Sequence, residues 1–159
     1  YLSLIQYSDE ALRELIEHYK SIDEPTMIVF FGDHQPSFAS ELVKTYYPDK
    51  TTQEQRLIGS ATPFIIWTNY DSPSEEYIAV SPSILGAMVA QQAGFDLPAL
   101  PNLIMSRIYP KISVAHEAGV VSRENGTIYD IDHLPENLQT EWDKWQKLCY
   151  YYLFDSQTQ

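Results

Sequence analysis

The sequence predicts an α/β fold in which helices cover a mainly parallel sheet. Two apolar runs without polar alternation, Met27–Phe31 and Pro63–Thr68, are typical of strands buried on both faces. Segments with apolar residues at helical spacing lie beside these runs along the chain. A helix, a short loop and a buried strand are parts of a βαβ unit, and this order occurs twice.

The first helix is predicted over Ser3–Tyr19. Leu12 and Leu15 lie at helical spacing between charged residues, which gives the segment one apolar face. Ser3 and Gln6 have the spacing of a capping box at the start of this helix.

The next segment contains the first predicted strand. Pro25 cannot continue a helix, so Met27–Phe31 should follow as a strand that Gly32 ends. Ser40–Tyr47 is then predicted to be a short helix, and Asp49–Arg56 a polar loop.

The second strand, Pro63–Thr68, is followed by a turn-rich stretch and another helix. Ser81 is suited to the N-cap of that helix, Pro82 to its first position and Gly94 to its end.

The last part of the chain has a different composition. Prolines from Pro98 onward predict a loop-rich connection. Asn125-Gly126 between Val120–Arg123 and Thr127–Ile131 predicts a β-hairpin. A closing helix follows from Pro135. We therefore divide the chain into an α/β half, a loop-and-hairpin region and a closing helix, over residues 1–97, 98–134 and 135–155.

Composition restricts the function. A chain of 159 residues is long enough for one domain, or for a piece of a larger one. Its net charge of -12 argues against nucleic-acid binding, and it means that an anionic substrate needs a local cation. Cys149 is the only cysteine, which excludes an internal disulfide and a cysteine-rich zinc site. The chain begins at Tyr1 with helix-like sequence, so we expect a longer parent protein.

The candidate site is the corner Gly32-Asp33-His34 at the end of the first predicted strand. Ligands collect at the carboxyl edge of parallel sheets, where strand-to-helix loops vary. Carboxylate oxygen with imidazole nitrogen suits manganese, zinc or iron better than calcium or magnesium. Asp33 and His34 are therefore predicted metal ligands. An alternative is that Asp33 caps the turn and His34 is an ordinary histidine.

The segment Thr26–Ser37, with its apolar strand and Asp33-His34 pair, resembles the lipoteichoic-acid-synthase-like sulfatases of the alkaline phosphatase superfamily. Ala61–Trp67 resembles the family's next core strand, and Trp142–Asp155 its closing helix. The resemblance implies a partial alkaline-phosphatase-like fold in the C-terminal part of the catalytic domain. The best-known members have Tyr-Gly after the Asp-His pair, whereas this chain has Gln35-Pro36.

The resemblance also implies a function. Members of this family bind manganese or magnesium through a Glu, a nucleophilic Thr and the Asp-His pair, and only the pair is carried over, to Asp33 and His34. The Glu and Thr are expected upstream of Tyr1, so the chain alone should be inactive. The parent would transfer phosphoglycerol from an anionic lipid headgroup to a cell-envelope polymer. It would work on the extracytoplasmic face of a bacterial membrane, anchored by segments outside this chain.

Other functions remain open. The parent could be a sulfatase, phosphatase or phosphodiesterase that acts on a soluble ester; the chain could be a non-catalytic binding module that keeps the fold, or an unrelated α/β binding domain. Zinc and calcium are the other metals considered. Unpaired sheet edges would allow a homodimer of the isolated chain.

Other residues that could carry chemistry are expected to be structural. His18, His116 and His133 are predicted to lie at a helix end or in loops, and Asp130 and Asp132 to form turns. The three tryptophans are predicted core anchors: Trp67, Trp142 and Trp145. Neither Ser37 nor Thr62 can be argued to replace the missing nucleophile, although Ser37 lies close to the corner in sequence.

Overall fold

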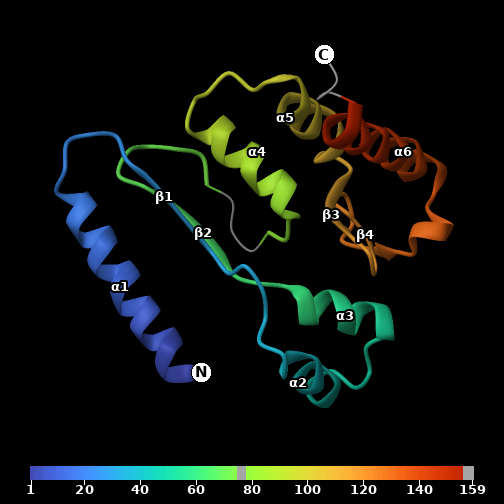
Figure 1. Ribbon diagram of the computed structural model, residues 1–159, viewed down its shortest axis with the longest axis horizontal. Helices are drawn as coiled ribbons and strands as arrows, with labels where there is room; N and C mark the ends of the chain where they lie inside the picture. The colour runs from blue at the N-terminus through green and yellow to red at the C-terminus, as the bar shows by residue number, and fades with distance from the viewer. Residues whose placement is uncertain (75–77, 156–159) are drawn as a thin grey trace. The chain divides into compact units, whose positions relative to one another are not determined.

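The computed structural model describes residues 1–74 and 78–155 (Figure 1). These residues belong to two compact units. Unit 1 consists of Tyr1–Asp33 and Thr62–Ser74, and unit 2 contains the rest of the chain. The chain is of mixed α/β class, as the sequence predicts. Among the described helices, none combines the length and apolarity needed to cross a bilayer.

Unit 1 begins with helix α1, Leu2–Lys20, which confirms the amphipathic helix predicted from sequence. The predicted capping box is wrong. The N-cap is Tyr1, without a side-chain cap hydrogen bond, and Gln6 Nε2 instead donates to Glu10 Oε1 at 2.9 Å, one turn further along. The helix therefore begins two residues earlier than the Ser3 cap would allow.

The two predicted strands form a pair in unit 1, β1 (Met27–Phe31) and β2 (Phe64–Thr68). The pair is antiparallel, with Met27 opposite Thr68 and Phe31 opposite Phe64, so the prediction of a mainly parallel sheet is wrong for these strands. An unbroken apolar run predicts an apolar environment but does not fix strand direction. Direction depends on the path of residues 32–63, which return the chain alongside β1.

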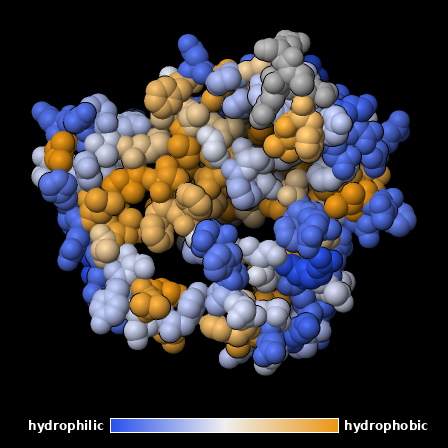
Figure 2. Space-filling view, viewed as in Figure 1, coloured by the Kyte–Doolittle hydropathy of each residue, from blue (hydrophilic) through white to orange (hydrophobic). Residues whose placement is uncertain are grey.

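The strand pair exposes apolar side chains. Phe30, Phe31 and Ile65 are 37%, 58% and 46% exposed, and Figure 2 shows hydrophobic surface gathered over β1 and β2. None of the described residues of unit 1 is fully buried. The prediction that helices cover the strands on both faces is therefore not met within this unit.

Asn69 ties the elements of unit 1 together. Its Oδ1 accepts a hydrogen bond from the backbone N–H of Thr26 at 2.8 Å. Its Nδ2 lies within hydrogen-bond distance of the carbonyl oxygens of Tyr19, Ile22 and Glu24, at 3.2, 3.0 and 2.9 Å. One amide at the end of β2 thus fixes the path of the chain from the end of α1 to the start of β1.

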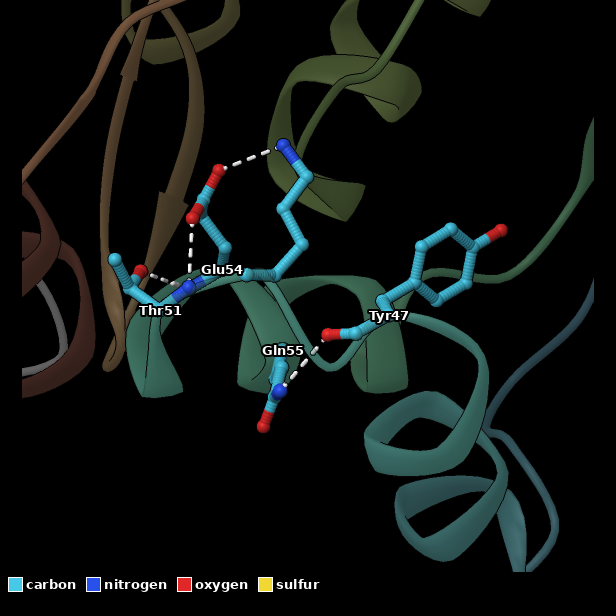
Figure 3. Close-up of polar contacts among 5 residues, drawn as sticks. Tyr47, Thr51, Glu54 and Gln55 are labelled. Atoms are coloured by element: carbon cyan, nitrogen blue, oxygen red, sulfur yellow. Dashed lines mark hydrogen bonds and ion pairs between the residues drawn. The ribbon is translucent and has the colours of Figure 1, made fainter.

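Unit 2 opens with two short helices, α2 (Ala39–Tyr46) and α3 (Thr52–Ser60). The first agrees with the predicted helix, whereas the prediction of a polar loop through Arg56 is wrong. Helix α3 is started by a capping box: Thr51 Oγ1 accepts from the Glu54 N–H at 3.2 Å, and Glu54 Oε2 accepts from the Thr51 N–H at 2.8 Å (Figure 3).

The remaining elements of unit 2 surround its hydrophobic core. In chain order they are α4 (Pro82–Gln92), α5 (Ala99–Leu103), the π-helical segment η1 (Ile104–Ile108), β3 (Ile112–His116), β4 (Gly119–Ser122), β5 (Ile128–Tyr129), the 3₁₀ segment η2 (Ile131–His133), α6 (Glu136–Tyr150) and the π-helical segment η3 (Tyr151–Asp155). The core is centred on four fully buried or nearly fully buried residues: Ile84, Ile108, Ile112 and Val120.

The start of α4 confirms the sequence prediction, with Ser81 at the N-cap and Pro82 following. The Ser81 hydroxyl makes no cap hydrogen bond; it accepts from the Ala115 N–H at 2.7 Å instead and so fixes α4 against β3. Trp145 is 9% exposed in the core cluster, and Trp142 packs against it, which confirms their predicted role as core anchors.

The loop-and-hairpin prediction for residues 98–134 holds only in part. The hairpin is present as β4 and β5, paired antiparallel, and β3 joins it to form a three-stranded sheet. The elements α5, η1 and β3 were not predicted from sequence. Their apolar residues are interrupted by Pro101 and Pro110, which conceal the periodicity. Burial of Ile104, Ile108 and Ile112 in the core shows what stabilises them.

Candidate metal corner

Gly32 directly follows β1 and lies against the segment before β2. Its N–H donates to the Pro63 carbonyl at 3.0 Å, and its carbonyl accepts from Thr62 Oγ1 at 2.8 Å. A Cβ at Gly32 would lie 3.0 Å from Thr62 Cβ, closer than ordinary packing allows. Gly32 is not among the glycines with positive φ. Close approach to Thr62 explains the need for glycine here.

Asp33 and His34 follow this contact, and both side chains are exposed. They also mark the division of the chain, since Asp33 is the last residue of the first segment of unit 1 and His34 begins unit 2. The two donors predicted from sequence therefore lie exposed at the end of β1. A peptide bond joins them.

The orientation of the His34 ring is fixed by a neighbour. His34 Nδ1 lies 3.0 Å from the carbonyl oxygen of Gln35. A carbonyl oxygen can only accept, so Nδ1 carries the proton in this contact, and the lone pair of the neutral ring is on Nε2. Metal-binding histidines are commonly held by such a contact at their other nitrogen. This partner of His34 was not predicted from sequence.

Gln35 is itself anchored within unit 2. Its side-chain Nε2 donates to the carbonyl oxygen of Ala61. The Gln35 side chain, at the position where the best-known family members have Tyr, thus has a local structural role. The Gln35 carbonyl sets the His34 tautomer, and the Gln35 side chain holds the backbone that carries this carbonyl.

The donor set fits part of a metal site. A carboxylate oxygen and a neutral imidazole nitrogen are suitable ligands for manganese, zinc or iron. Within residues 1–74 and 78–155, no three His, Cys, Asp or Glu side chains lie close enough together to hold an ion. A catalytic zinc usually has three protein ligands, so Asp33 and His34 would supply two of the three.

The other residues considered as functional candidates from sequence are either exposed or engaged in local hydrogen bonds. His18 and His133 are exposed, and Asp130 Oδ1 accepts from the Asp132 N–H at 2.9 Å, which is the predicted turn-forming role. Thr62 donates its hydroxyl hydrogen to the Gly32 carbonyl, which is a local structural contact. Ser37 is exposed in the turn before α2.

A second polar site, in unit 2, was missed by the sequence analysis. Helices α2 and α3 and the turn between β3 and β4 line an open, solvent-facing cavity of about 210 Å³. Its lining includes Lys44, Arg56 and His116. These residues are far apart in sequence, and Arg56 fell in the segment predicted to be a loop. No local pattern could have joined them.

Comparison with known proteins identifies the family. The sequence profile of the sulfatase family matches residues 1–94, which include the corner. No solved structure matches the chain.

Two curated relatives come from Rhizobium meliloti. A protein named "Putative cyclic beta-1,2-glucan modification protein" is 27% identical over 132 residues, which are 79% of this chain and 20% of the relative. A protein named "Capsular polysaccharide biosynthesis protein RkpI" is 38% identical over 55 residues, 33% of this chain and 9% of the relative. The chain thus spans a fifth or less of these relatives. Because the family profile covers more than half of its residues, the chain belongs to the sulfatase family.

Proposed function

We propose that this chain supplies two metal ligands, Asp33 and His34, to an enzyme that transfers phosphoglycerol to a cell-envelope saccharide. The observation that carries the proposal is the corner itself. Two suitable donors are exposed directly after β1, and the His34 ring is held by the Gln35 carbonyl so that Nε2 carries its lone pair. Members of the sulfatase superfamily typically use divalent metal ions.

Within this proposal, manganese is the preferred ion because the donors are one carboxylate and one imidazole. A bound divalent cation lowers the pKa of a coordinated hydroxyl and neutralises charge on a phosphoryl or sulfuryl group. Asp33 would provide a charged oxygen and His34 a neutral nitrogen. The contacts of Gly32 with Thr62 and Pro63 would hold the end of β1 in place, and Gln35 would hold the imidazole.

The names of the relatives support a saccharide acceptor. One is named for modification of a cyclic glucan and the other for capsular polysaccharide biosynthesis. These names are compatible with the proposed extracytoplasmic location, and membership of the sulfatase family supports a phosphate or sulfate ester as substrate. The nucleophile and the remaining ligands would come from the part of the parent protein that lies outside this chain.

The test uses the parent protein with Asp33→Asn or His34→Gln. Loss of an outer partner of a metal ligand costs about 10- to 100-fold in metal affinity, so loss of a direct ligand should cost at least about 100-fold. Manganese affinity is measured by calorimetry, and phosphoglycerol transfer with radiolabelled phosphatidylglycerol. Circular dichroism should show an unchanged fold. His133→Gln, at another exposed histidine, is the matched control and should bind manganese normally.

Unchanged manganese affinity in both corner variants would refute the metal role. Substrate class is decided by a separate arm, in which the parent is given an aryl sulfate, a phosphate monoester and phosphatidylglycerol. Turnover of the soluble esters without transfer from the lipid would favour a hydrolase over the proposed transferase.

A further inference from the structure

We propose that the cavity between α2, α3 and the β3–β4 turn binds the anionic substituent of a phosphorylated or sulfated saccharide. We call it the α2–α3 cavity. Its lining includes six polar or charged residues that can contact such a group: Ser40, Lys44, Thr52, Arg56, His116 and Glu117. All belong to unit 2, and the inference does not depend on the metal role of Asp33 and His34.

The charge of the lining differs from that of the whole chain. The chain has a net charge of -12, yet Lys44 and Arg56 place two cations beside one carboxylate, Glu117. Glu117 Oε1 pairs with a single Arg56 nitrogen, Nη2, at 2.7 Å. Arginine carries five N–H donors in a fixed fork, so this contact leaves others able to meet an oxyanion. In the described part of the chain, no carboxylate pairs with Lys44.

His116 adds a hydrogen-bond donor to the lining, because its contacts fix which ring nitrogen carries the proton. Its Nδ1 accepts a hydrogen bond from the backbone N–H of Ala118 at 3.0 Å. An N–H can only donate, so Nδ1 is unprotonated and the proton of the neutral ring is on Nε2. His116 can therefore donate to a phosphate or sulfate oxygen without being charged. Ser40 and Thr52 contribute hydroxyl groups, which suit the hydroxyls of a sugar.

The helices that carry these groups are fixed to each other. Gln55 Nε2, in α3, donates to the carbonyl oxygen of Tyr47 at 2.9 Å, just beyond the end of α2 (Figure 3). The buried side chain of Val43 lies beside Gly59, where an added Cβ would be 3.9 Å from Val43 Cγ2. Lys44 and Arg56 are thus presented from a preformed helix pair.

The β3–β4 turn is also held close to α3. A Cβ on Gly119 would lie 2.7 Å from Gln53 Nε2, and the φ of Gly119 is +154°. The ion pair between Arg56 and Glu117 joins the same two elements. His116 and Glu117 therefore have defined positions relative to α3, as a binding site requires.

The size of the cavity limits its ligand. A volume of about 210 Å³ is below the range of roughly 300–1,000 Å³ that is usual for drug-sized ligands. It accommodates one charged substituent with part of a sugar ring rather than an extended oligosaccharide. Cations with hydroxyl and imidazole donors match a phosphate or sulfate group, whereas an apolar ligand would leave these donors unpaired.

The experiment is a titration of the isotope-labelled chain, followed by NMR, with EDTA present so that metal at Asp33 and His34 cannot contribute. Inorganic phosphate is expected to shift the amide signals of Lys44, Arg56 and His116. Glucose 6-phosphate should bind at least as tightly, and glucose should not bind. Binding only to phosphatidylglycerol vesicles, or no shift at these residues, would overturn the proposal.

Three variants test the charges. Exposed ion pairs contribute about 0.2–1 kcal/mol, so Lys44→Gln should weaken phosphate binding by up to about fivefold. Lys147→Gln makes the same charge change on α6 and should have no effect. Glu117→Gln removes the competing carboxylate and should strengthen binding. Equal weakening by Lys44→Gln and Lys147→Gln, or weaker binding in Glu117→Gln, would contradict a specific site.

Discussion

The hydroxyl of Thr62 donates a 2.8 Å hydrogen bond to the carbonyl oxygen of Gly32, immediately before Asp33. The two residues are packed so closely that any side chain at position 32 would press on Thr62 Cβ. This contact holds the end of β1, directly before the candidate metal ligands. The Thr62 hydroxyl can be removed by substitution with valine, which has the same branched shape.

Thr62→Val keeps the branched side chain but removes the donor. Unit 1 should lose about 1 kcal/mol of stability, the usual net contribution of one hydrogen bond. The Gly32 amide, bonded to Pro63, should exchange faster with solvent. Denaturant unfolding and hydrogen exchange measure the two effects. Thr62→Ser keeps the hydroxyl and should retain slow exchange; equally fast exchange in both variants would show that the hydrogen bond has no role.

A negative charge introduced at Asn69 tests the hydrogen bonds that its side-chain amide makes. In Asn69→Asp the Thr26 N–H keeps its acceptor, but the carbonyl oxygens of Tyr19, Ile22 and Glu24 face a carboxylate instead of an amide donor. Asn69→Ala should destabilise unit 1 by roughly 1 kcal/mol, because partly buried backbone groups lose a hydrogen-bond partner. Asn69→Asp should be worse at neutral pH.

Urea unfolding at pH 7 compares the two variants. Asn137→Asp changes the charge equally at an exposed position near the start of α6 and should not destabilise the chain. If Asn69→Asp were as stable as Asn69→Ala or more so, the orientation assigned to the Asn69 amide would be wrong.

Glu141 is a buried acid with asymmetric partners. It is 4% exposed, and its Oε1 lies 3.0 Å from Lys144 Nζ and 3.3 Å from Lys111 Nζ, while Oε2 is buried without a hydrogen-bond partner. Burial raises the pKa of Glu141, but the hydrogen bonds from Lys144 and Lys111 outweigh it and the pKa lies below its usual value. The two lysines therefore favour the ionised form of the Glu141 side chain despite its burial.

Removing the acid and removing its partners should differ in effect. Glu141→Met should change stability by less than about 1 kcal/mol, because the two lysines are 44% exposed and can be hydrated. The double change Lys111→Met with Lys144→Met leaves an unpaired buried charge and should cost roughly 3–5 kcal/mol. Thermal unfolding measures both. Lys147→Met is the control, and a greater loss in Glu141→Met than in the double variant would contradict this account.

The lowered pKa of Glu54, in the capping box of α3, predicts that this helix is sensitive to acid. The hydrogen bond from Lys50, with those from the backbone and hydroxyl of Thr51, lowers the pKa of Glu54 from 4.5 to about 2. A lowered folded-state pKa stabilises the chain above the unfolded value, and this contribution is lost as pH falls from about 4.5 through about 2. Helix α3 should therefore fray over this window.

Carbon-13 titration of the Glu54 carboxyl should give a midpoint of about 2. Lys50→Met removes the largest cause of the lowering and should raise this midpoint toward 4.5. A wild-type midpoint near 4.5 would show that the capping box does not persist in solution. Glu54→Gln should remove the acid sensitivity of the α3 amide signals.

Local features of the fold could be predicted from sequence. Apolar periodicity gave α1, and Pro82 and Asn125-Gly126 marked the start of α4 and the β4–β5 hairpin correctly. Helix α3 was missed although Thr51 and Glu54 have the spacing of a capping box, because its weak apolar pattern suggested a loop. The capping-box spacing of Thr51 and Glu54 could therefore have been used to predict α3 from the sequence.

Relationships between distant segments could not be predicted. The antiparallel direction of β1 and β2 depends on how residues 32–63 return, and the α2–α3 cavity joins Lys44 to His116. Asp33 and His34 were identified by position and by resemblance, and their role as metal ligands remains a prediction. The contact of His34 with the Gln35 carbonyl depends on backbone geometry that residue types do not specify.

The pairing of β1 with β2 also has a kinetic consequence. Phe31 can meet Phe64 only after residues 32–63 have closed a loop, whereas α2 and α3 lie wholly inside this loop and form through local contacts. Helices form in about a microsecond or less, and non-local strand pairing is slower. The helical hairpin should therefore fold first. The strand end that presents Asp33 should be among the later parts of the chain to acquire its final geometry.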